Sequence, residues 1–214
     1  MASSSLAQSL ESHLTALRAC RRCANMHAPP IANGPVKTRL LIVGQAPGVR
    51  EPELQRPFAW TAGKTLFKWF QAASGIDEAG IRERVYFAAV CRCFPGKSGK
   101  GSGDRVPDGV EIENCSRWMQ AEFDLLQPQL VIPIGKLAIS QFLKFGKLTE
   151  VIGGMHSLEK FGHRFDLIPL PHPSGVSTWH NREPGKSLLS EAMERVANHP
   201  VFVDEVVNRQ SRGG

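Results

Sequence analysis

The order of apolar and polar positions along the chain predicts short buried strands that alternate with amphipathic helices. Continuous apolar runs bounded by turn residues are typical of buried strands, and apolar residues spaced three or four apart are typical of helices. The runs predict four strands, at residues 39–43, 84–90, 129–134 and 165–170. The helical spacing predicts helices at residues 5–19, 63–73, 110–126, 136–143 and 187–197. This alternation favours an α/β fold with a mostly parallel four-stranded sheet that is covered on both faces.

Length and composition define the broad class of the protein. A chain of 214 residues can bury a sizeable core, and no repeat or clear boundary divides it. We therefore expect one domain over residues 1–214, with a polar tail at about 207–214. The apolar runs are too short to span a membrane, and the N-terminus lacks the pattern of a secretory signal, so we expect a cytoplasmic monomer. The net charge of +6 favours a polyanionic partner.

Five cysteines are a further feature of the chain. Cys20 and Cys23 form a Cys-x-x-Cys pair, and Cys91, Cys93 and Cys115 follow later. An odd number of cysteines in a cytoplasmic protein argues against a disulfide framework. Ligation of a metal or cluster and plain buried thiols both remain open.

Two loops carry the residues that point to chemistry. The first predicted strand ends in the segment Gly44-Gln-Ala-Pro-Gly48, a turn built from glycine and proline. The last predicted strand ends in Leu170-Pro-His-Pro-Ser-Gly175. Loops at the carboxyl ends of parallel strands form the binding crevices of α/β proteins. We therefore expect both loops to contribute to one site.

Both loops resemble the active-site motifs of the uracil-DNA glycosylase superfamily. The first is similar to the Gly-Glu-Ala-Pro-Gly motif of the family 4, thermostable-type enzymes, with Gln45 in place of the glutamate. The second is similar to the His-Pro-Ser-Pro loop, with Gly175 in place of the last proline. The likeness to family 4 runs from about Cys20 to His172, and it includes the segment 44–58 without a gap. It implies a three-layer α/β/α sandwich, and the alternation of elements agrees.

The resemblance implies a monofunctional DNA glycosylase of base excision repair. Such a hydrolase cleaves the N-glycosidic bond of uracil that has been extruded from DNA, and it leaves an abasic site. No lysine lies in a recognised Schiff-base motif, so no strand cleavage is expected. The alternatives are a glycosylase for a broader set of deaminated bases, a catalytically weak module that binds uracil-DNA or abasic DNA, and an iron–sulphur or zinc protein without glycosylase activity.

Residue by residue, the resemblance assigns roles within the first and second motifs. His172 matches the histidine that donates to the uracil O2 region, and Phe58 matches the phenylalanine on which the base stacks. Gln45 and Ala46 stand where relatives have a carboxylate. We therefore expect Glu51 to position the attacking water, with Gln45 as a neutral orienter. The residues expected at the substrate are Gly44, Ala46, Pro47, Gly48, Phe58 and Ala89.

The residue that selects the base in the family is replaced at position 89 of this chain. The strand that resembles the family's uracil-reading strand has Ala89 where an asparagine reads the N3 and O4 edge. An alanine offers no amide to separate uracil from cytosine. Gln45 is a candidate substitute for the missing asparagine.

Cysteine ligands and DNA contacts complete the set of residues carried over from the resemblance. Four cysteines match in order the [4Fe–4S] ligands of family 4, namely Cys20, Cys23, Cys93 and Cys115. Zinc uses the same ligand set, and unligated thiols remain a third interpretation. Residues 97–103 account for an unusually long interval between the last two cysteines. The residues expected to contact DNA are Ser174, Val176, Trp179 and Arg182.

Overall fold

A five-stranded sheet forms the centre of the protein. The computed structural model describes residues 2–99, 103–175 and 178–209 of the 214-residue chain. The strands are β1 (Leu40–Gly44), β2 (Tyr86–Ala89), β3 (Leu130–Pro133), β4 (His156–Lys160) and β5 (His163–Leu167). Their order in the sheet is β2-β1-β3-β5-β4. All neighbouring pairs are parallel except β4 and β5, which form an antiparallel hairpin at one edge.

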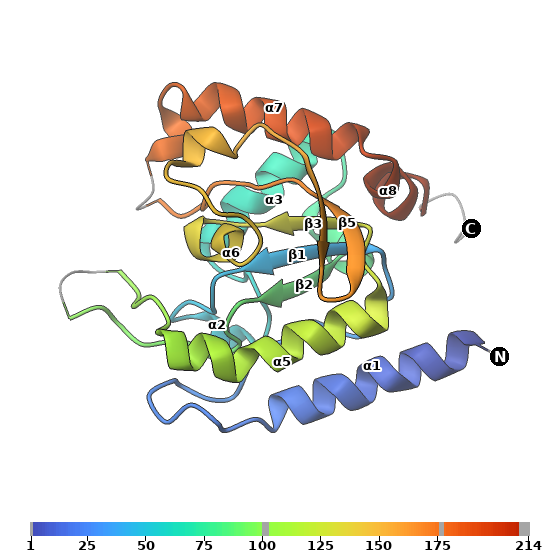
Figure 1. Ribbon diagram of the computed structural model, residues 1–214, viewed down its shortest axis with the longest axis vertical. Helices are drawn as coiled ribbons and strands as arrows, with labels where there is room; N and C mark the ends of the chain where they lie inside the picture. The colour runs from blue at the N-terminus through green and yellow to red at the C-terminus, as the bar shows by residue number, and fades with distance from the viewer. Residues whose placement is uncertain (1, 100–102, 176–177, 210–214) are drawn as a thin grey trace.

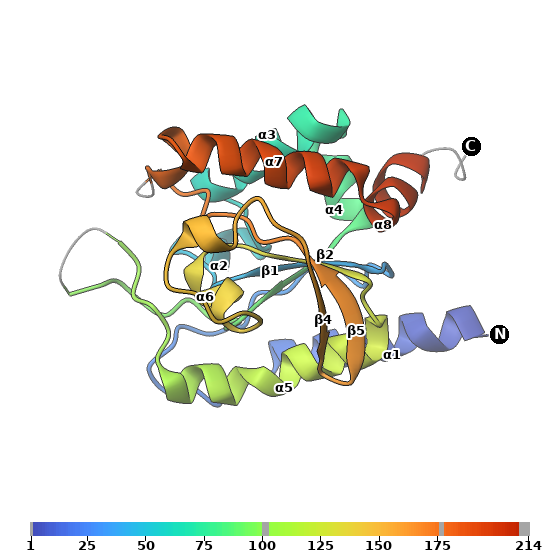
Figure 2. The ribbon, with the colours of Figure 1, turned by 45° about the horizontal axis from the view of Figure 1, so that its top comes forward.

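Helices cover both faces of this sheet. The α-helices are α1 (Ala2–Arg18), α2 (Glu51–Leu54), α3 (Thr61–Ser74), α4 (Glu78–Arg84), α5 (Gly109–Leu126), α6 (Lys136–Ser140), α7 (Gly185–Asn198) and α8 (Pro200–Phe202). Short 3-10 turns occur at η1 (Leu148–Glu150) and η2 (Trp179–Asn181), and η3 (Val203–Val207) is π-helical. α1 and α5 lie on one side of the sheet, and α3 and α7 lie on the other (Figure 2). The predicted three-layer α/β/α sandwich is confirmed.

Alternating side chains of the strands supply two separate cores. Successive residues of a strand point to opposite faces, so Ile42 and Val43 of β1 enter different layers. Ile42 packs in the core that includes Leu66 and Phe70 of α3. Val43 packs in the core that includes Phe123 of α5 and Leu14 of α1. The continuous apolar runs seen in the sequence therefore follow from burial of both faces of a parallel sheet.

Several elements lie where the sequence pattern predicts none. β4 is a fifth strand, and its residues are mostly polar because it forms a partly exposed edge of the sheet. α2 is a single short turn of helix that follows the first motif. α4 is also short, and its N-terminus is capped by Asp77, whose side chain accepts a hydrogen bond from the N–H of Gly80. No helix among the described residues is both long and apolar enough to cross a membrane.

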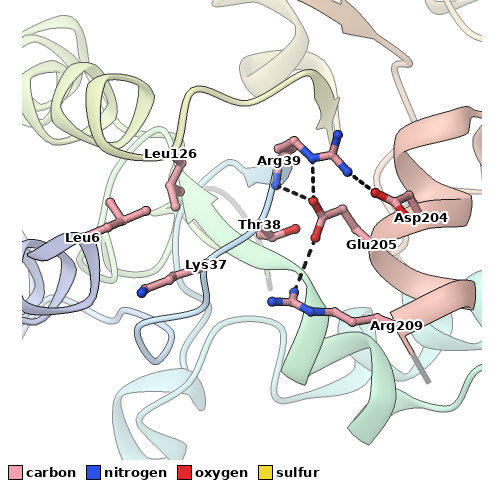
Figure 3. A pocket seen from close by; sticks show the side chains of 8 residues that line it. All are labelled: Leu6, Lys37, Thr38, Arg39, Leu126, Asp204, Glu205 and Arg209. Carbon is pink, nitrogen blue, oxygen red and sulfur yellow. Dashed lines mark hydrogen bonds and ion pairs between the residues drawn. The ribbon is translucent and has the colours of Figure 1, made fainter. Parts of the chain in front are cut away.

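The carboxyl ends and the amino ends of the parallel strands form two different edges of the sheet. The carboxyl ends of β1, β2 and β3 point to the same side of the molecule, away from both chain ends (Figure 1). At the amino edge, Arg39 precedes β1 and forms ion pairs with Asp204 and Glu205 of η3 (Figure 3). These residues line a cavity of about 350 Å³. The ion pairs at the amino edge therefore join the start of β1 to η3.

Candidate active site

A narrow cleft lies at the carboxyl edge of the sheet. It is lined by Ile31, Gly44, Gln45, Ala46, Pro47, Glu51, Pro57, Phe58, Phe87, Ala88, Ala89 and His172. The fold thus brings both sequence motifs to one place, although more than 120 positions separate Gln45 from His172. The cleft has a volume of about 30 Å³.

The wall formed by β1 and β2 continues beyond both strands. Gly44 lies beside Ala89 in the parallel register. The N–H of Val90 then donates to the carbonyl of Gly44 at 2.9 Å, and the N–H of Cys91 donates to the carbonyl of Gln45 at 3.0 Å. These bonds fix the backbone of Gln45 next to Ala89. The side chain proposed to replace the missing asparagine is therefore adjacent to the position that lacks it.

Phe58 forms the opposite wall in an uncommon backbone conformation. Its φ of 52° lies in the left-handed region, which non-glycine residues rarely adopt. A Cβ atom at Gly44 would lie 2.9 Å from the ring of Phe58, so a side chain at position 44 would displace the ring. A Cβ at Gly63 would lie 1.7 Å from the carbonyl oxygen of Phe58. Both glycines are therefore needed for Phe58 to face the cleft.

Arg82 of α4 holds the Phe58 segment. Its guanidinium donates to the carbonyl oxygens of Pro57 and Phe58, each at 2.9 Å. Its Nε donates to Glu78 at 2.8 Å, and its Cζ lies 4.4 Å from the centre of the Phe67 ring. Burial lowers the pKa of Arg82, but the partner carboxylate of Glu78 opposes that change. Two N–H groups of the Arg82 guanidinium thus hold the backbone at Phe58 in its left-handed conformation.

Glu51 joins the two ends of the loop that carries Phe58. One carboxylate oxygen accepts from the N–H of Gly48, and the other accepts from the N–H of Ala59 at 3.1 Å. Burial raises the pKa of Glu51, and backbone hydrogen bonds from Gly48, Ala59 and Phe58 oppose that rise, as does the charge of Arg82. Glu51 lines the cleft. Its two oxygens accept from the backbone at both ends of the loop, so it acts as a clamp on the loop.

His172 presents a defined nitrogen to the cleft. The N–H of Ser174 donates to Nδ1 of His172 at 3.2 Å, so Nδ1 is the acceptor nitrogen of a neutral ring. The proton of the neutral ring is then on Nε2. Burial lowers the pKa of His172, and the nearby His180 lowers it further. Near neutral pH, the ring is therefore an uncharged donor through Nε2.

Three of the residues expected to contact DNA are described, and they do not line the cleft. Ser174 is half-buried beside His172, and Arg182 is exposed. Trp179 is half-buried against the core on the α3 and α7 side. Its carbonyl oxygen would lie 2.1 Å from a Cβ at Gly185, so the tryptophan sits tightly under the start of α7. Val176 lies outside the described residues.

The four cysteines expected to bind a metal line a second cavity, of about 230 Å³. Burial, together with the neighbouring thiols, raises the pKa of Cys93 to about 12. No three His, Cys, Asp or Glu side chains in the described part of the chain are positioned to hold a metal ion. Arg92 Nε and Trp118 Nε1 are buried without hydrogen-bond partners there, and both residues line the cavity. The four thiols and the two unused N–H donors thus line one cavity.

The comparison with protein families decides which fold family this site belongs to. The family model described as the uracil DNA glycosylase superfamily matches residues 31–197. That range includes both motifs and every residue that lines the cleft. The chain belongs to the uracil DNA glycosylase superfamily.

Individual members of the superfamily align over most of the chain. The Type-4 uracil-DNA glycosylase of Archaeoglobus fulgidus is 27% identical over 180 residues, which is 79% of this chain and 83% of the relative. The Type-4 enzyme of Thermotoga maritima is 30% identical over 159 residues, 73% of this chain and 75% of the relative. A Type-5 uracil-DNA glycosylase of Pyrobaculum aerophilum is 27% identical over 156 residues, which is 68% of this chain and 66% of the relative.

This superfamily member has three residues near the cleft that the motifs do not mark. Arg82 supports Phe58 from another helix, and no local pattern indicates that contact. Trp60 follows Phe58 closely and is 47% exposed, with the cations of Arg50 and Lys64 at 5.6 and 5.7 Å from its ring. Asp104 lies beside Gly48. A tryptophan flanked by basic residues was the one signal available in the sequence.

Proposed function

We propose that this protein is a monofunctional uracil-DNA glycosylase. It hydrolyses the bond between uracil and deoxyribose in a nucleotide extruded from DNA, and it leaves an abasic site. The observation that carries the proposal is the cleft in which Phe58 and His172 face the loop that begins at Gly44. This arrangement offers a stacking surface and a neutral donor, which are the two groups that a leaving uracil needs. Membership of the superfamily supports the same reaction class.

The chemistry assigned to His172 follows from its hydrogen bonds. As the glycosidic bond breaks, its electron pair moves onto the base, and negative charge builds on the uracil O2. We assign to Nε2–H of His172 the donation to that oxygen, because Nδ1 is already occupied by the N–H of Ser174. A fixed donor aimed at developing charge in a site closed to water is an effective form of catalysis. Phe58 holds the base by stacking.

The attacking water needs a group that orients it toward the sugar. Gln45 and Glu51 both line the cleft, and their predicted roles in orienting the water stay predictions. Gln45 carries no charge and can orient a water without removing its proton. A transition state with a cationic sugar requires less of a base than direct attack would require.

Ala89 favours a second candidate function, a glycosylase with broader specificity for deaminated bases. The wall beside Gly44 has no side-chain amide at position 89 to read the pyrimidine edge. Gln45 is the adjacent side chain that can do so, and its amide can turn to offer either a donor or an acceptor. We therefore propose uracil as the main substrate and deaminated purines as the competing class.

We also propose that the cavity lined by Cys20, Cys23, Cys93 and Cys115 holds a [4Fe–4S] cluster. Its support is the four-thiol lining and the two unused N–H donors of Arg92 and Trp118. When bound, the cluster joins the segments that follow α1 and β2 to α5. Protein prepared without oxygen should be brown and contain iron. If the protein is colourless and contains stoichiometric zinc, the four cysteines form a zinc site. If it contains no metal, they are buried thiols without a ligand.

The DNA surface is proposed to surround the mouth of the cleft. Ser174 and Arg182 remain the predicted phosphate contacts. We add Trp60, because an exposed aromatic ring between two cations can stack on an unpaired base while Arg50 and Lys64 neutralise phosphates. Trp179 is packed against the core and is less suited to enter DNA.

The decisive experiment is a glycosylase assay with matched oligonucleotides. Single- and double-stranded DNA that contains one uracil is incubated with an excess of protein and then cleaved with alkali. The same sequences with cytosine, thymine, hypoxanthine or xanthine in place of the uracil serve as comparisons. Release of uracil supports the proposal. Uracil strands that stay intact, under conditions where the protein binds them, would contradict it and favour a module that only binds DNA.

A further inference from the structure

The first motif has no carboxylate at the positions where relatives have one. Gln45 and Ala46 are neutral, and Glu51 uses both oxygens to bind the N–H groups of Gly48 and Ala59. The reaction nevertheless builds positive charge on the sugar and releases a proton from the attacking water. A carboxylate from elsewhere in the chain would meet both needs.

Asp104 is placed next to this gap by the segment that leads into α5. Lys97 and Asp104 face each other as an antiparallel pair, and Nζ of Lys97 lies 2.8 Å from Oδ1 of Asp104. The following residue, Arg105, is fixed by its bonds to the carbonyl of Pro95 and to Glu111. The segment is therefore anchored to α5, and Asp104 is held in one place.

The second oxygen of Asp104 faces the first motif. A Cβ atom at Gly48 would lie 3.3 Å from Oδ2 of Asp104 and 3.8 Å from Oε2 of Glu51. The absence of a side chain at position 48 is what lets the two carboxylates flank the loop. Asp104 also interacts electrostatically with His172 of the second motif and favours the charged form of its ring. Its charge therefore reaches both walls of the cleft.

We propose that Asp104 is the carboxylate that acts on the attacking water in this enzyme. The assignment rests on the proposed glycosylase function. The bond between C1′ and N1 breaks with its electron pair moving to the base, and the water oxygen bonds to C1′. The proton lost by that water passes to Oδ2 of Asp104 and then to solvent. The same negative charge stabilises the cationic sugar before attack. Glu51 shapes the loop, and Lys97 holds the other oxygen of Asp104.

The test uses single-turnover excision of uracil at saturating enzyme, with DNA affinity measured separately. Asp104→Asn keeps the shape of the side chain and removes its charge. Asp124→Asn makes the same change near the far end of α5, on a side chain that is 58% exposed, and serves as the matched control. Lys97→Met removes the ion pair and leaves the carboxylate. Glu51→Gln tests the competing carboxylate.

We expect Asp104→Asn to slow the saturated rate by about 10²-fold or more, in the range of a positioned general base. Its affinity for uracil-DNA should stay the same or rise, because a negative charge near phosphates is removed. Asp124→Asn should keep the saturated rate within about threefold of the unmodified protein. Lys97→Met should lose less than Asp104→Asn, because the carboxylate remains. A wild-type rate for Asp104→Asn would overturn the inference, while the glycosylase function would stand. An inactive unmodified protein would instead refute the function itself.

Discussion

The protonation of His172 sets an expectation at the scale of a single residue. Burial and His180 lower its pKa, while Asp104 raises it, and the net shift is downward. The neutral donor should therefore persist below pH 6.5, the ordinary value for histidine. The single-turnover rate should stay level from about pH 8 to below that value, and it should fall at more acidic pH. A rate that already halves near pH 6.5 would show that the ring is not shielded as the structure indicates.

The lowered pKa of His172 also makes the stability of the fold depend on pH. Between the lowered pKa of folded His172 and its ordinary value, the unfolded chain binds more protons than the folded chain. The contribution of His172 to stability is therefore complete above the ordinary value and is lost as the pH falls below it. Urea unfolding of the unmodified protein and of His172→Asn, compared at pH 7.5 and 5.5, measures this difference.

Phe58 and His172 should each be needed for excision while the fold survives. Phe58→Ala removes the stacking surface, which should weaken the reacting complex by about 1–3 kcal/mol, as for base–aromatic stacking in single-strand binders. His172→Ala removes the donor to the leaving base. Excision rates at enzyme excess measure the effect, and circular dichroism checks the fold. A wild-type rate in either variant would remove that residue from the site.

Trp60 offers a test of the DNA surface. Trp60→Ala should weaken binding of single-stranded uracil-DNA by about 1–3 kcal/mol if a base stacks on the ring. The saturated excision rate should change little, because Trp60 does not line the cleft. Val207→Ala removes an exposed apolar side chain at the opposite edge of the sheet and is the control. Equal affinities for the two variants would contradict the stacking role.

At the scale of elements, a buried ion pair joins the three segments that carry the cysteines. Arg92 follows β2 and donates to Glu122 of α5, with one of the two distances at 2.8 Å. Glu122 also interacts with His13 of α1 and accepts from the hydroxyl of Tyr86. Burial alone would raise the pKa of Glu122, but Arg92 and His13 hold it below its usual value. The network contributes stability above that usual value and loses it in acid.

Removing one partner of this network should destabilise the protein strongly. Arg92→Met or Glu122→Leu leaves a buried charge without its partner, which costs about 3–5 kcal/mol of unfolding free energy in comparable pairs. The double variant should lose less than the sum of the two single losses, since no buried charge is left alone. Urea unfolding of the three variants measures the coupling. Additive losses would indicate that the two charges act independently.

The sequence pattern predicts most of the strands and the longer helices. The four parallel strands and five main helices were predictable, because burial on both faces leaves continuous apolar runs and helical spacing. β4 was missed because a partly exposed edge strand has polar residues. The cleft was predicted through its motifs, but Asp104 and Arg82 were not, because their contacts with Gly48 and Phe58 arise only in the folded chain.

At the scale of the whole molecule, the charge balance predicts how binding depends on salt. The chain carries a net charge of +6, and a protein that neutralises phosphates releases counterions from DNA. Affinity for uracil-DNA should therefore fall steeply as salt rises from 50 to 200 mM. The saturated excision rate should fall much less, because the chemistry occurs in a partly enclosed cleft. An affinity independent of salt would argue against the basic surface as the DNA contact.

The ion pairs at the amino edge have a consequence for how the protein is made. Arg39 immediately precedes the strand that ends in Gly44, yet its partner Glu205 lies 166 positions later in the chain. A ribosome has therefore added 166 residues after Arg39 before this partner exists. The first strand can lie in the sheet earlier, but it gains its anchor at that edge only after Glu205 has been made. A nascent chain stalled before Glu205 would already contain both motifs, and the strand that carries the first of them would still lack this anchor.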